Sequence, residues 1–146
     1  MHKPKVKDIM TEDPACCTPE TRLQDVARMM VEEDCGEIPV VESEQSKKPV
    51  GVITDRDIVC RAVAQGKNPL ELTAKDCMSS PCVTVKTETS LADCCKTMED
   101  NRIRRVPVID EGGDCRGIVS QADIAIKGEP RTAAEVVKKV SEVARV

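Results

Sequence analysis

One stretch decides the fold, Gly51-Val52-Ile53-Thr54-Asp55-Arg56-Asp57-Ile58, and it returns 66 residues later as Gly117-Ile118-Val119-Ser120-Gln121-Ala122-Asp123-Ile124. In both copies a short apolar run, typical of a buried strand, meets a Thr/Ser-x-x-Asp pattern that is typical of a helix start. In such a capping box the hydroxyl accepts from an amide in the first turn, and the carboxylate accepts from the amide of the cap. The stretch therefore predicts, twice in one chain, a strand that leads directly into a helix.

Further blocks show that the duplication extends through most of the chain. Asp8-Ile9-Met10 returns as Asp76-Cys77-Met78, and Pro39-Val40-Val41-Glu42 returns as Pro107-Val108-Ile109-Asp110, both at an offset of 68. The same offset relates three helix positions to one another: Leu23 to Leu91, Asp25 to Asp93 and Met30 to Met98. A two-residue difference in a loop explains the change of offset from 68 to 66. Such self-similarity indicates a fold built from two copies of one unit.

Each copy predicts the order strand, helix, strand, strand, helix. The expected elements of the first copy are 15–18, 22–33, 38–41, 50–53 and a last helix that Thr54 caps and Gly66 ends, with Thr21 as the cap of the first helix. Those of the second copy are 82–85, 91–100, 106–109, 115–119 and 120–127, with a turn at Gly112-Gly113. The pattern over 132–146 predicts an amphipathic helix whose apolar side holds Ala133, Val136, Val137, Val140 and Val143.

The predicted fold class is α/β, of the α+β kind. It has two pseudo-two-fold related β-α-β-β-α repeats packed through their sheets, because a half of about 60 residues with three short strands is marginal alone. We divide the chain into repeat 1 (1–66), a linker (67–73), repeat 2 (74–128) and a C-terminal amphipathic helix (129–146), which packs on its own domain or on a second chain. The seams between two such repeats are where small-molecule sites tend to lie.

The composition argues against several classes of protein. With 40% hydrophobic and 33% charged residues the chain can bury a core, so it is not a disordered segment. A formal charge of −4 and the absence of Phe, Tyr and Trp argue against binding of nucleic acid or of an anionic membrane. An odd set of nine cysteines, with no apolar run of membrane-spanning length, predicts a reducing, cytoplasmic location. The single histidine, His2, lies beside the terminus, so we expect no enzyme and no catalytic residues.

The three ordered blocks resemble the CBS domain family, and residues 6–127 resemble a tandem CBS pair, or Bateman module, of the stand-alone type. This resemblance implies a regulatory sensor that binds an adenosine-containing ligand: AMP, ADP, ATP, NAD or S-adenosylmethionine. AMP and ATP rank first among them, and no cofactor is required. The resemblance further implies a homodimer that regulates another, unidentified protein.

Thr54, Asp57, Ser120 and Asp123 are the candidate ribose-binding residues. A capping box alone would explain them, since such patterns open many helices. If they face a cleft, however, the carboxylate can accept from both hydroxyls of a ribose, and first-turn amides can meet a phosphate. Together with the resemblance this favours ribose binding, with the cap as a second duty of the same residues.

In CBS pairs the ribose residues of one copy act together with the first and second strands of the other copy. Carried over to this chain, site A combines Thr54 and Asp57 with adenine contacts from Val83, Ile103 and Pro107 and phosphate contacts from Arg102, Arg104 and Arg105. Site B combines Ser120 and Asp123 with Ala15, Cys35 and Pro39, and its corresponding corner holds Asp34, Gly36 and Glu37. Arg56 is a further candidate for phosphate, with an exposed helix surface as its alternative role.

The two sites therefore differ in charge. Each contact from an arginine to phosphate contributes about 1.5–3 kcal/mol, whereas a carboxylate in the same place repels the ligand. We expect phosphorylated ligands to prefer site A, and site B to take an uncharged adenosine end or nothing. The alternative for the arginines is an ordinary solvated turn.

The cysteines carry the alternative function. None of them forms a CxxC pattern, and Cys94 and Cys95 lie on an expected helix with an apolar stripe, so buried structural thiols are favoured and no metal site is predicted. Cys16, Cys17, Cys35 and Cys82 nevertheless fall on expected strands or cleft edges. A cysteine-based metal-binding or redox-responsive CBS protein is therefore the second hypothesis.

Overall fold

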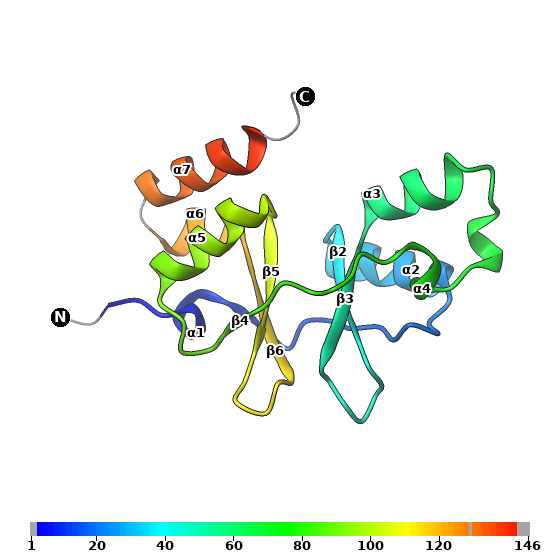
Figure 1. Ribbon diagram of the computed structural model, residues 1–146, viewed down its shortest axis with the longest axis horizontal. Coiled ribbons are helices and arrows are strands. Elements are labelled where there is room, and N and C mark those ends of the chain that lie inside the picture. The colour runs from blue at the N-terminus through cyan, green and yellow to red at the C-terminus, as the bar shows by residue number, and fades with distance from the viewer. Residues whose placement is uncertain (1–2, 129, 143–146) are drawn as a thin grey trace. The chain divides into compact units, whose positions relative to one another are not determined.

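The computed structural model describes residues 3–128 and 130–142, and its elements divide between two units (Figure 1). Unit 1 comprises Met1–Asp13, Val83–Gly112 and Arg116–Val146. Unit 2 comprises Pro14–Cys82 and Gly113–Cys115. Neither unit is continuous in sequence, because each contains most of one repeat together with the segment that opens the other repeat.

The sheet of unit 1 has the order β1-β6-β5-β4. β1 (Thr11–Glu12) is antiparallel to β6 (Cys115–Ser120), and β4 (Val85–Lys86) is parallel to β5 (Arg105–Ile109). The helices of this unit are α1 (Val6–Ile9), α5 (Leu91–Asn101), α6 (Gln121–Lys127) and α7 (Pro130–Ser141). Their apolar sides and the sheet form one core, in which Met98, Val108 and Ile124 are fully buried.

Unit 2 repeats this arrangement with shorter pairings. β2 (Glu37–Val41) and β3 (Pro49–Thr54) are antiparallel, while Cys17 bridges β2 and Ser79 bridges β3 in place of longer outer strands. Its helices are α2 (Leu23–Glu33), α3 (Asp55–Ile58), which continues as a π-helix over Val59–Val63, the 3-10 turn Pro69–Glu71, and α4 (Ala74–Cys77). The core of unit 2 includes Leu23, Val26, Ile38 and Ile53.

The two repeats exchange their opening segments. In unit 1 the amide of Leu91 donates to the carbonyl of Pro4 over 3.0 Å, which attaches the start of the chain to repeat 2. In unit 2 the amide of Leu23 donates to the carbonyl of Leu72 over 2.9 Å, which attaches the end of the linker, directly before repeat 2, to repeat 1. Both bonds occupy equivalent positions at the offset of 68, so the exchange is reciprocal.

The exchange explains the glycine that opens the deciding stretch. A Cβ atom on Gly51 would lie 2.6 Å from the carbonyl oxygen of Ser79, and one on Gly117 would lie 2.9 Å from that of Thr11. Both glycines therefore make room for the backbone of the exchanged segment.

The C-terminal helix packs on its own unit, which is one of the two arrangements expected for it. α7 contacts α5 and α6, and Val136 and Val140 are buried there. Val137, which the sequence places on the apolar side, is 45% exposed, so that part of the prediction is wrong. Val143 lies outside the described residues.

Most expected elements are confirmed, with three local corrections. The expected strand over 15–18 is reduced to a single bridge at Cys17, and the one over 82–85 is replaced by β4, which begins at Val85. Thr21 does not cap α2: the cap position is Arg22, and the Thr21 hydroxyl accepts from the amide of Thr18 instead. The outer strands are short and form few backbone hydrogen bonds with their neighbours. An apolar pattern alone therefore does not define where such a strand begins and ends.

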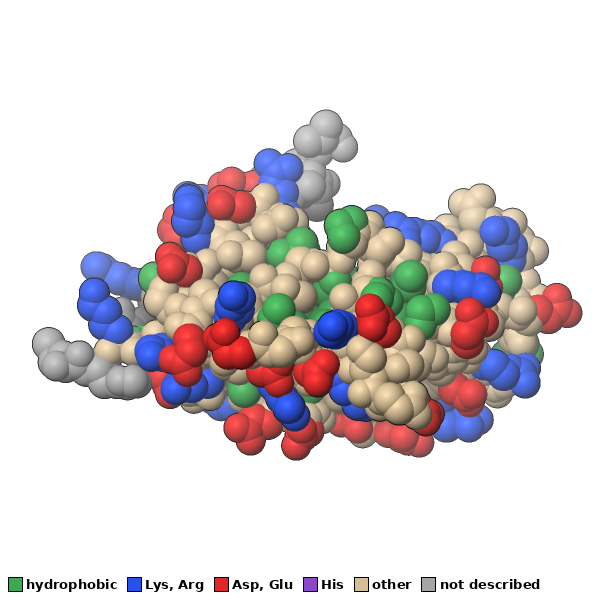
Figure 2. Space-filling view, turned by 60° about the horizontal axis from the view of Figure 1, so that its bottom comes forward, with side chains coloured by type: hydrophobic (Ala, Val, Ile, Leu, Met, Phe, Trp, Pro, Cys, Tyr) green, Lys and Arg blue, Asp and Glu red, His purple; other side chains and the backbone are tan. Residues whose placement is uncertain are grey.

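Within residues 3–128 and 130–142, no helix has the length and apolar character needed to cross a membrane. On the face shown in Figure 2, acidic and basic side chains are interspersed and no single-sign patch dominates.

Candidate functional site

The start of α3 holds the first candidate carboxylate in a capping box. Thr54 Oγ1 accepts from the amide of Asp57 over 3.0 Å, and Asp57 Oδ2 accepts from the amide of Thr54 over 3.0 Å. The Asp57 side chain is 15% exposed. The predicted capping role of Thr54 and Asp57 is therefore confirmed. The Asp57 carboxylate is held in position by the cap and remains partly accessible to solvent.

The start of α6 repeats the box with the second candidate pair. Ser120 Oγ accepts from the amide of Asp123 over 3.1 Å, and Asp123 Oδ2 accepts from the amide of Ser120 over 3.0 Å. Asp123 is 9% exposed. The two boxes thus match in geometry, which makes each an internal control for the other.

Each carboxylate also meets a hydroxyl from the exchanged segment, a contact that the sequence reasoning missed. Ser79 Oγ lies 3.3 Å from Asp57 Oδ1, and Thr11 Oγ1 lies 3.3 Å from Asp123 Oδ1. Ser79 and Thr11 directly follow Met78 and Met10 of the Asp-x-Met block, so the alignment of the two repeats shows that they are equivalent positions. The alignment does not show that each block packs on the opposite repeat, where its hydroxyl meets the carboxylate.

Arg61 adds a positive charge beside Asp57. Its guanidinium lies 4.0 Å from Asp57 Oδ1 and donates to the carbonyls of Cys77 and Met78 over 2.9 and 2.7 Å. Arg61 therefore lies between the Asp57 carboxylate and the backbone at the end of α4.

The amides at the start of α3 are not available to a phosphate, contrary to one expectation. The amide of Asp55 donates to the carbonyl of Gly36 over 3.0 Å, and that of Arg56 donates to Asp55 Oδ1 over 2.8 Å. The amide of Asp57 is used by Thr54. The first three amides of α3 are therefore already paired within the chain.

The three predicted phosphate-binding arginines lie in the short segment between the end of α5 and the start of β5. Arg102 ends α5 in a left-handed conformation (φ 55°), Arg104 is exposed, and Arg105 begins β5 half-buried. Among the described residues none of the three forms an ion pair or donates a side-chain hydrogen bond, so their positive charge is not neutralised within the unit. Arg56 is exposed on the surface of α3.

The corresponding corner of unit 2 has the same backbone and the opposite charge. Asp34 ends α2 in a left-handed conformation (φ 50°), as Arg102 ends α5. Gly36 and Glu37 take the places of Arg104 and Arg105. Equivalent backbone positions therefore carry three positive charges in one unit and two negative charges in the other.

The predicted adenine contacts are placed in two equivalent groups. In unit 1, Val83 and Ile103 are half-buried against the core, and Pro107 is buried in β5. In unit 2, Ala15 and Cys35 are half-buried against the core, and Pro39 is buried in β2. The half-buried members retain apolar surface that a flat ring could cover.

Most cysteines behave as buried apolar side chains. Burial raises the pKa of Cys17 and of Cys94 to about 12, and that of Cys95 to about 11. Burial, assisted by the charge of Glu37, raises the pKa of Cys82 to about 11. In the described part of the chain no three His, Cys, Asp or Glu residues are grouped as a metal site would require. The structural interpretation of Cys94 and Cys95 is confirmed by their burial.

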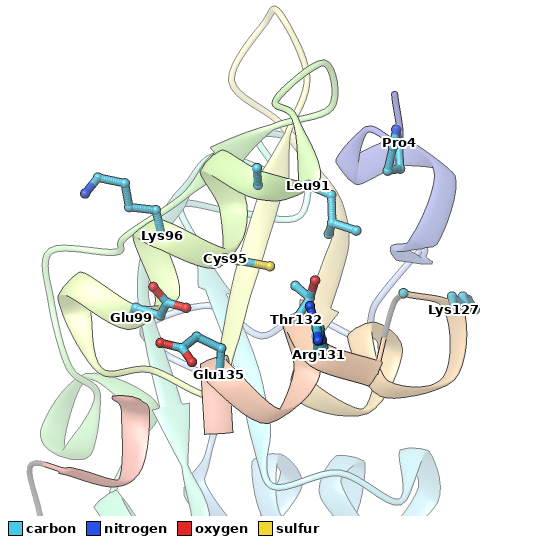
Figure 3. A pocket seen from close by; sticks show the side chains of 11 residues that line it. Pro4, Leu91, Cys95, Lys96, Glu99, Lys127, Arg131, Thr132 and Glu135 are labelled. Atoms are coloured by element: carbon cyan, nitrogen blue, oxygen red, sulfur yellow. The ribbon is translucent and has the colours of Figure 1, made fainter. Parts of the chain in front are cut away.

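A surface cavity of about 760 Å³ lies elsewhere in unit 1, between α5 and the start of α7 (Figure 3). Leu91 and Cys95 form part of its floor, while Glu99, Arg131 and Glu135 lie at its rim. None of the predicted ribose, adenine or phosphate residues lines this cavity, and its rim carries charges of both signs. It is therefore separate from the candidate site.

Comparison with known proteins agrees with this arrangement. The family model of the CBS domain matches residues 6–63 and 74–127. An uncharacterized protein of Methanopyrus kandleri is 35% identical over 145 residues, which is 97% of this chain and 72% of that protein. Hypoxic response protein 1 of Mycobacterium tuberculosis is 34% identical over 119 residues, covering 82% of this chain and 81% of that protein.

Two solved structures share the fold. The crystal structure of Hypoxic Response Protein I with two coordinated zinc ions superposes with a TM-score of 0.76, at 33% identity, over 84% of this chain and 98% of that one. The CBS domain pair of protein MJ0100, in complex with 5'-methylthioadenosine and S-adenosyl-L-methionine, gives a TM-score of 0.75 at 27% identity, over 86% of this chain and 95% of that one.

Proposed function

Because this chain belongs to the CBS domain family, we propose that it is a regulatory module that binds an adenosine-containing ligand through residues of both repeats. The observation that carries the proposal is the pair of capping boxes in which one carboxylate oxygen is held by the backbone. The second oxygen of Asp123 meets a long hydroxyl contact, and that of Asp57 meets a long hydroxyl contact and the Arg61 guanidinium 4.0 Å away. Each of these oxygens retains acceptor capacity for ribose hydroxyls.

In this proposal the stronger site is site A. Thr54 and Asp57 bind the ribose, and Val83, Ile103 and Pro107 contact the adenine through apolar side chains. The phosphates meet Arg102, Arg104 and Arg105, with Arg56 as a further contact. Support comes from the arginines, which have no acidic partner among the described residues and so give up no ion pair when they bind phosphate.

Site B has the same ribose pair and the opposite charge. Ser120 and Asp123 would act with Ala15, Cys35 and Pro39, but the negative charges of Asp34 and Glu37 oppose a phosphate there. We therefore propose that AMP or ATP occupies site A, and that site B takes an uncharged adenosine end or nothing. Protein MJ0100 binds two adenosine compounds without a phosphate group, which is consistent with that chemistry at a CBS pair.

Regulation follows from a ligand that contacts both repeats. A ligand that binds one arrangement of the repeats more tightly shifts the population toward it, and the surface presented to a partner protein changes as a result.

We further propose a homodimer. Val31 and Ile126 are each 80% exposed, and Val59 is 56% exposed, so these aliphatic side chains are accessible to a second chain. Sedimentation equilibrium of the wild type and of Ile126→Asp measures the oligomeric state. We expect a dimeric wild type and a weakened dimer in the variant, and a monomeric wild type would contradict the proposed homodimer.

A thermal-shift panel tests the ligand proposal. Adenosine, AMP, ATP, NAD and S-adenosylmethionine are each titrated against the protein, with GMP as the control for the base, and positive ligands are measured by calorimetry. We expect AMP or ATP to raise the melting temperature, because a ligand that binds only the folded state stabilises it. No shift with any adenosine compound, at concentrations well above a micromolar Kd, would contradict the proposal.

The second candidate function is metal binding through cysteine. It is favoured by the two zinc ions coordinated in the structure of Hypoxic Response Protein I. In residues 3–128 and 130–142 of this chain, no three metal-ligating side chains are grouped, so a metal would need a ligand from elsewhere. Metal analysis of protein purified without chelator separates the two hypotheses: stoichiometric zinc with no response to adenosine compounds would reverse their order.

A further inference from the structure

Two basic side chains at equivalent positions of the repeats, Arg61 and Lys127, bind the ends of the exchanged helices. Arg61 donates to the carbonyls of Cys77 and Met78 over 2.9 and 2.7 Å, and Lys127 donates to the carbonyl of Ile9 over 3.2 Å. Cys77 ends α4 and Ile9 ends α1. The last carbonyls of a helix have no partner within it, and a cationic side chain nearby can bind them. Each unit therefore ties its exchanged helix to the helix that follows the capping box.

The tie in unit 2 has more contacts than the tie in unit 1. Arg61 makes two bonds where Lys127 makes one, and its guanidinium also lies 4.0 Å from Asp57 Oδ1. Arg61 lies in the π-helix Val59–Val63, whereas α6 is an α-helix as far as Lys127. Single π-helical turns are rare and are frequent at functional sites. The local geometry of unit 2 therefore distinguishes Arg61 from its counterpart.

The segment that Arg61 ties carries a hydroxyl of the candidate site. Ser79 directly follows Met78, and its Oγ lies 3.3 Å from Asp57 Oδ1. The backbone of Ser79 exchanges hydrogen bonds of 2.8 and 3.0 Å with Val52, but this pairing is an isolated bridge. The equivalent segment of unit 1 continues as β1, which pairs with β6. The end of α4 is therefore held by a shorter backbone pairing than the end of α1, and it depends more on its side-chain tie.

We propose that Arg61 is a positioning residue of site A, which clasps the end of α4 and so keeps the Ser79 hydroxyl on the Asp57 carboxylate. The ligand step of this role rests on the function proposed above. A ligand that binds Asp57 only while the segment is closed must also hold the segment closed, because coupling between two equilibria is reciprocal. Arg61 thereby links occupancy of site A to the attachment of an exchanged segment.

Amide hydrogen exchange of the free full-length protein, followed by NMR, measures the clasp without any ligand. The amides of Met78 and Ser79 exchange when the end of α4 opens, since a helix of four residues is not stable alone. The amide of Ile53, in the core of unit 2, is the reference for unfolding of the whole unit. Arg61→Met keeps an apolar stem and removes both charge-assisted bonds, so it should speed exchange at Met78 and Ser79 by about tenfold relative to Ile53. Arg61→Lys, which supplies the chemistry of Lys127, should restore part of the protection.

Lys127→Met is the matched control for the clasp. It removes the equivalent bond in unit 1, where the amide of Met10 donates to the carbonyl of Val6 over 2.9 Å. This variant should speed exchange at Met10 and leave exchange at Ser79 unchanged. Circular dichroism confirms that every variant is folded.

The ligand step is measured with AMP and adenosine. AMP at ten times its Kd should slow exchange at Ser79 by about tenfold, because the segment can open only after the ligand leaves. Arg61→Met should weaken AMP and adenosine by the same factor, about threefold or more by calorimetry, because the clasp acts on the ribose carboxylate. In a Ser79→Ala background the same substitution should add little, since Arg61 acts through Ser79.

Three outcomes would overturn the proposal. The first is unchanged exchange at Met78 and Ser79 in free Arg61→Met. The second is AMP that binds the wild type without slowing exchange at Ser79. The third is a loss of AMP affinity without a loss of adenosine affinity, which would place Arg61 on the phosphate. A wild type that binds no adenosine compound refutes the proposed function instead, and exchange in the free protein then decides whether Arg61 clasps the segment.

Discussion

Asp57 and Asp123 allow the ribose role to be separated from the capping role. The two carboxylates close capping boxes of the same geometry, each with a 3.0 Å bond from the cap amide and a hydroxyl 3.3 Å away. Replacing either one with alanine removes the same bond from the cap amide and the same hydroxyl contact, and Asp57→Ala also removes the half-exposed ion pair with Arg61. Only Asp57 belongs to proposed site A, the ligand site that includes the arginines, so the two substitutions should differ in their effect on nucleotide binding.

The structure sets the magnitudes. Each substitution leaves one cap amide without its acceptor, which costs about 1–2 kcal/mol of unfolding free energy. Both side chains are mostly buried, so we expect the two losses to agree closely. Two hydrogen bonds from ribose hydroxyls to a carboxylate contribute about 1.5–3 kcal/mol each, so Asp57→Ala should weaken AMP binding by roughly 100-fold or more.

Two assays on the same preparations measure these effects. Urea unfolding should give nearly equal destabilisation for Asp57→Ala and Asp123→Ala. Calorimetry with AMP should give a large loss of affinity for the first variant and little change for the second. Equal losses of affinity would refute the asymmetry between the sites. Normal affinity in both variants, alongside reduced stability, would show that the carboxylates serve only as caps.

Three further predictions concern Arg104, the Ser79 and Thr11 hydroxyls, and the buried thiol of Cys94. Arg104→Glu should weaken AMP by about 30-fold or more and adenosine by less than about threefold, by calorimetry, because only AMP carries the phosphate; equal weakening would refute the phosphate role. Ser79→Ala should weaken AMP several-fold and Thr11→Ala should not, since only the Ser79 hydroxyl orients the carboxylate of site A; equal effects would contradict this. As pH rises from about 9 toward 12, the free energy of unfolding should fall by on the order of 4 kcal/mol through Cys94, whose thiol ionises readily only when unfolded. Urea unfolding across that range should show a shallower decline for Cys94→Ala, and an identical slope would argue against this cause.

Local patterns in the sequence predicted much of the fold. The strands β2, β3, β5 and β6 and the helices α2 and α5 lie close to their expected bounds, because each has an apolar period that is satisfied within the element and its immediate neighbours. The capping boxes at Thr54 and Ser120 were predictable for the same reason, since all of their atoms lie within four consecutive residues. The family could be recognised from the order of these blocks.

Contacts between distant segments could not be predicted in this way. The apolar residues of α1 and α4 show only that each helix must be buried, and either repeat offers an apolar surface that would accept it. The fold assigns each helix to the opposite repeat, and this assignment brings Ser79 to Asp57 and Thr11 to Asp123.

The positions of most helices and strands, and the carboxylates that cap the helices, are predictable from the residues because those interactions are local. Which distant side chains share a site depends on the folded chain, because apolar burial is not directional and leaves the choice of partner to the packing of the whole unit.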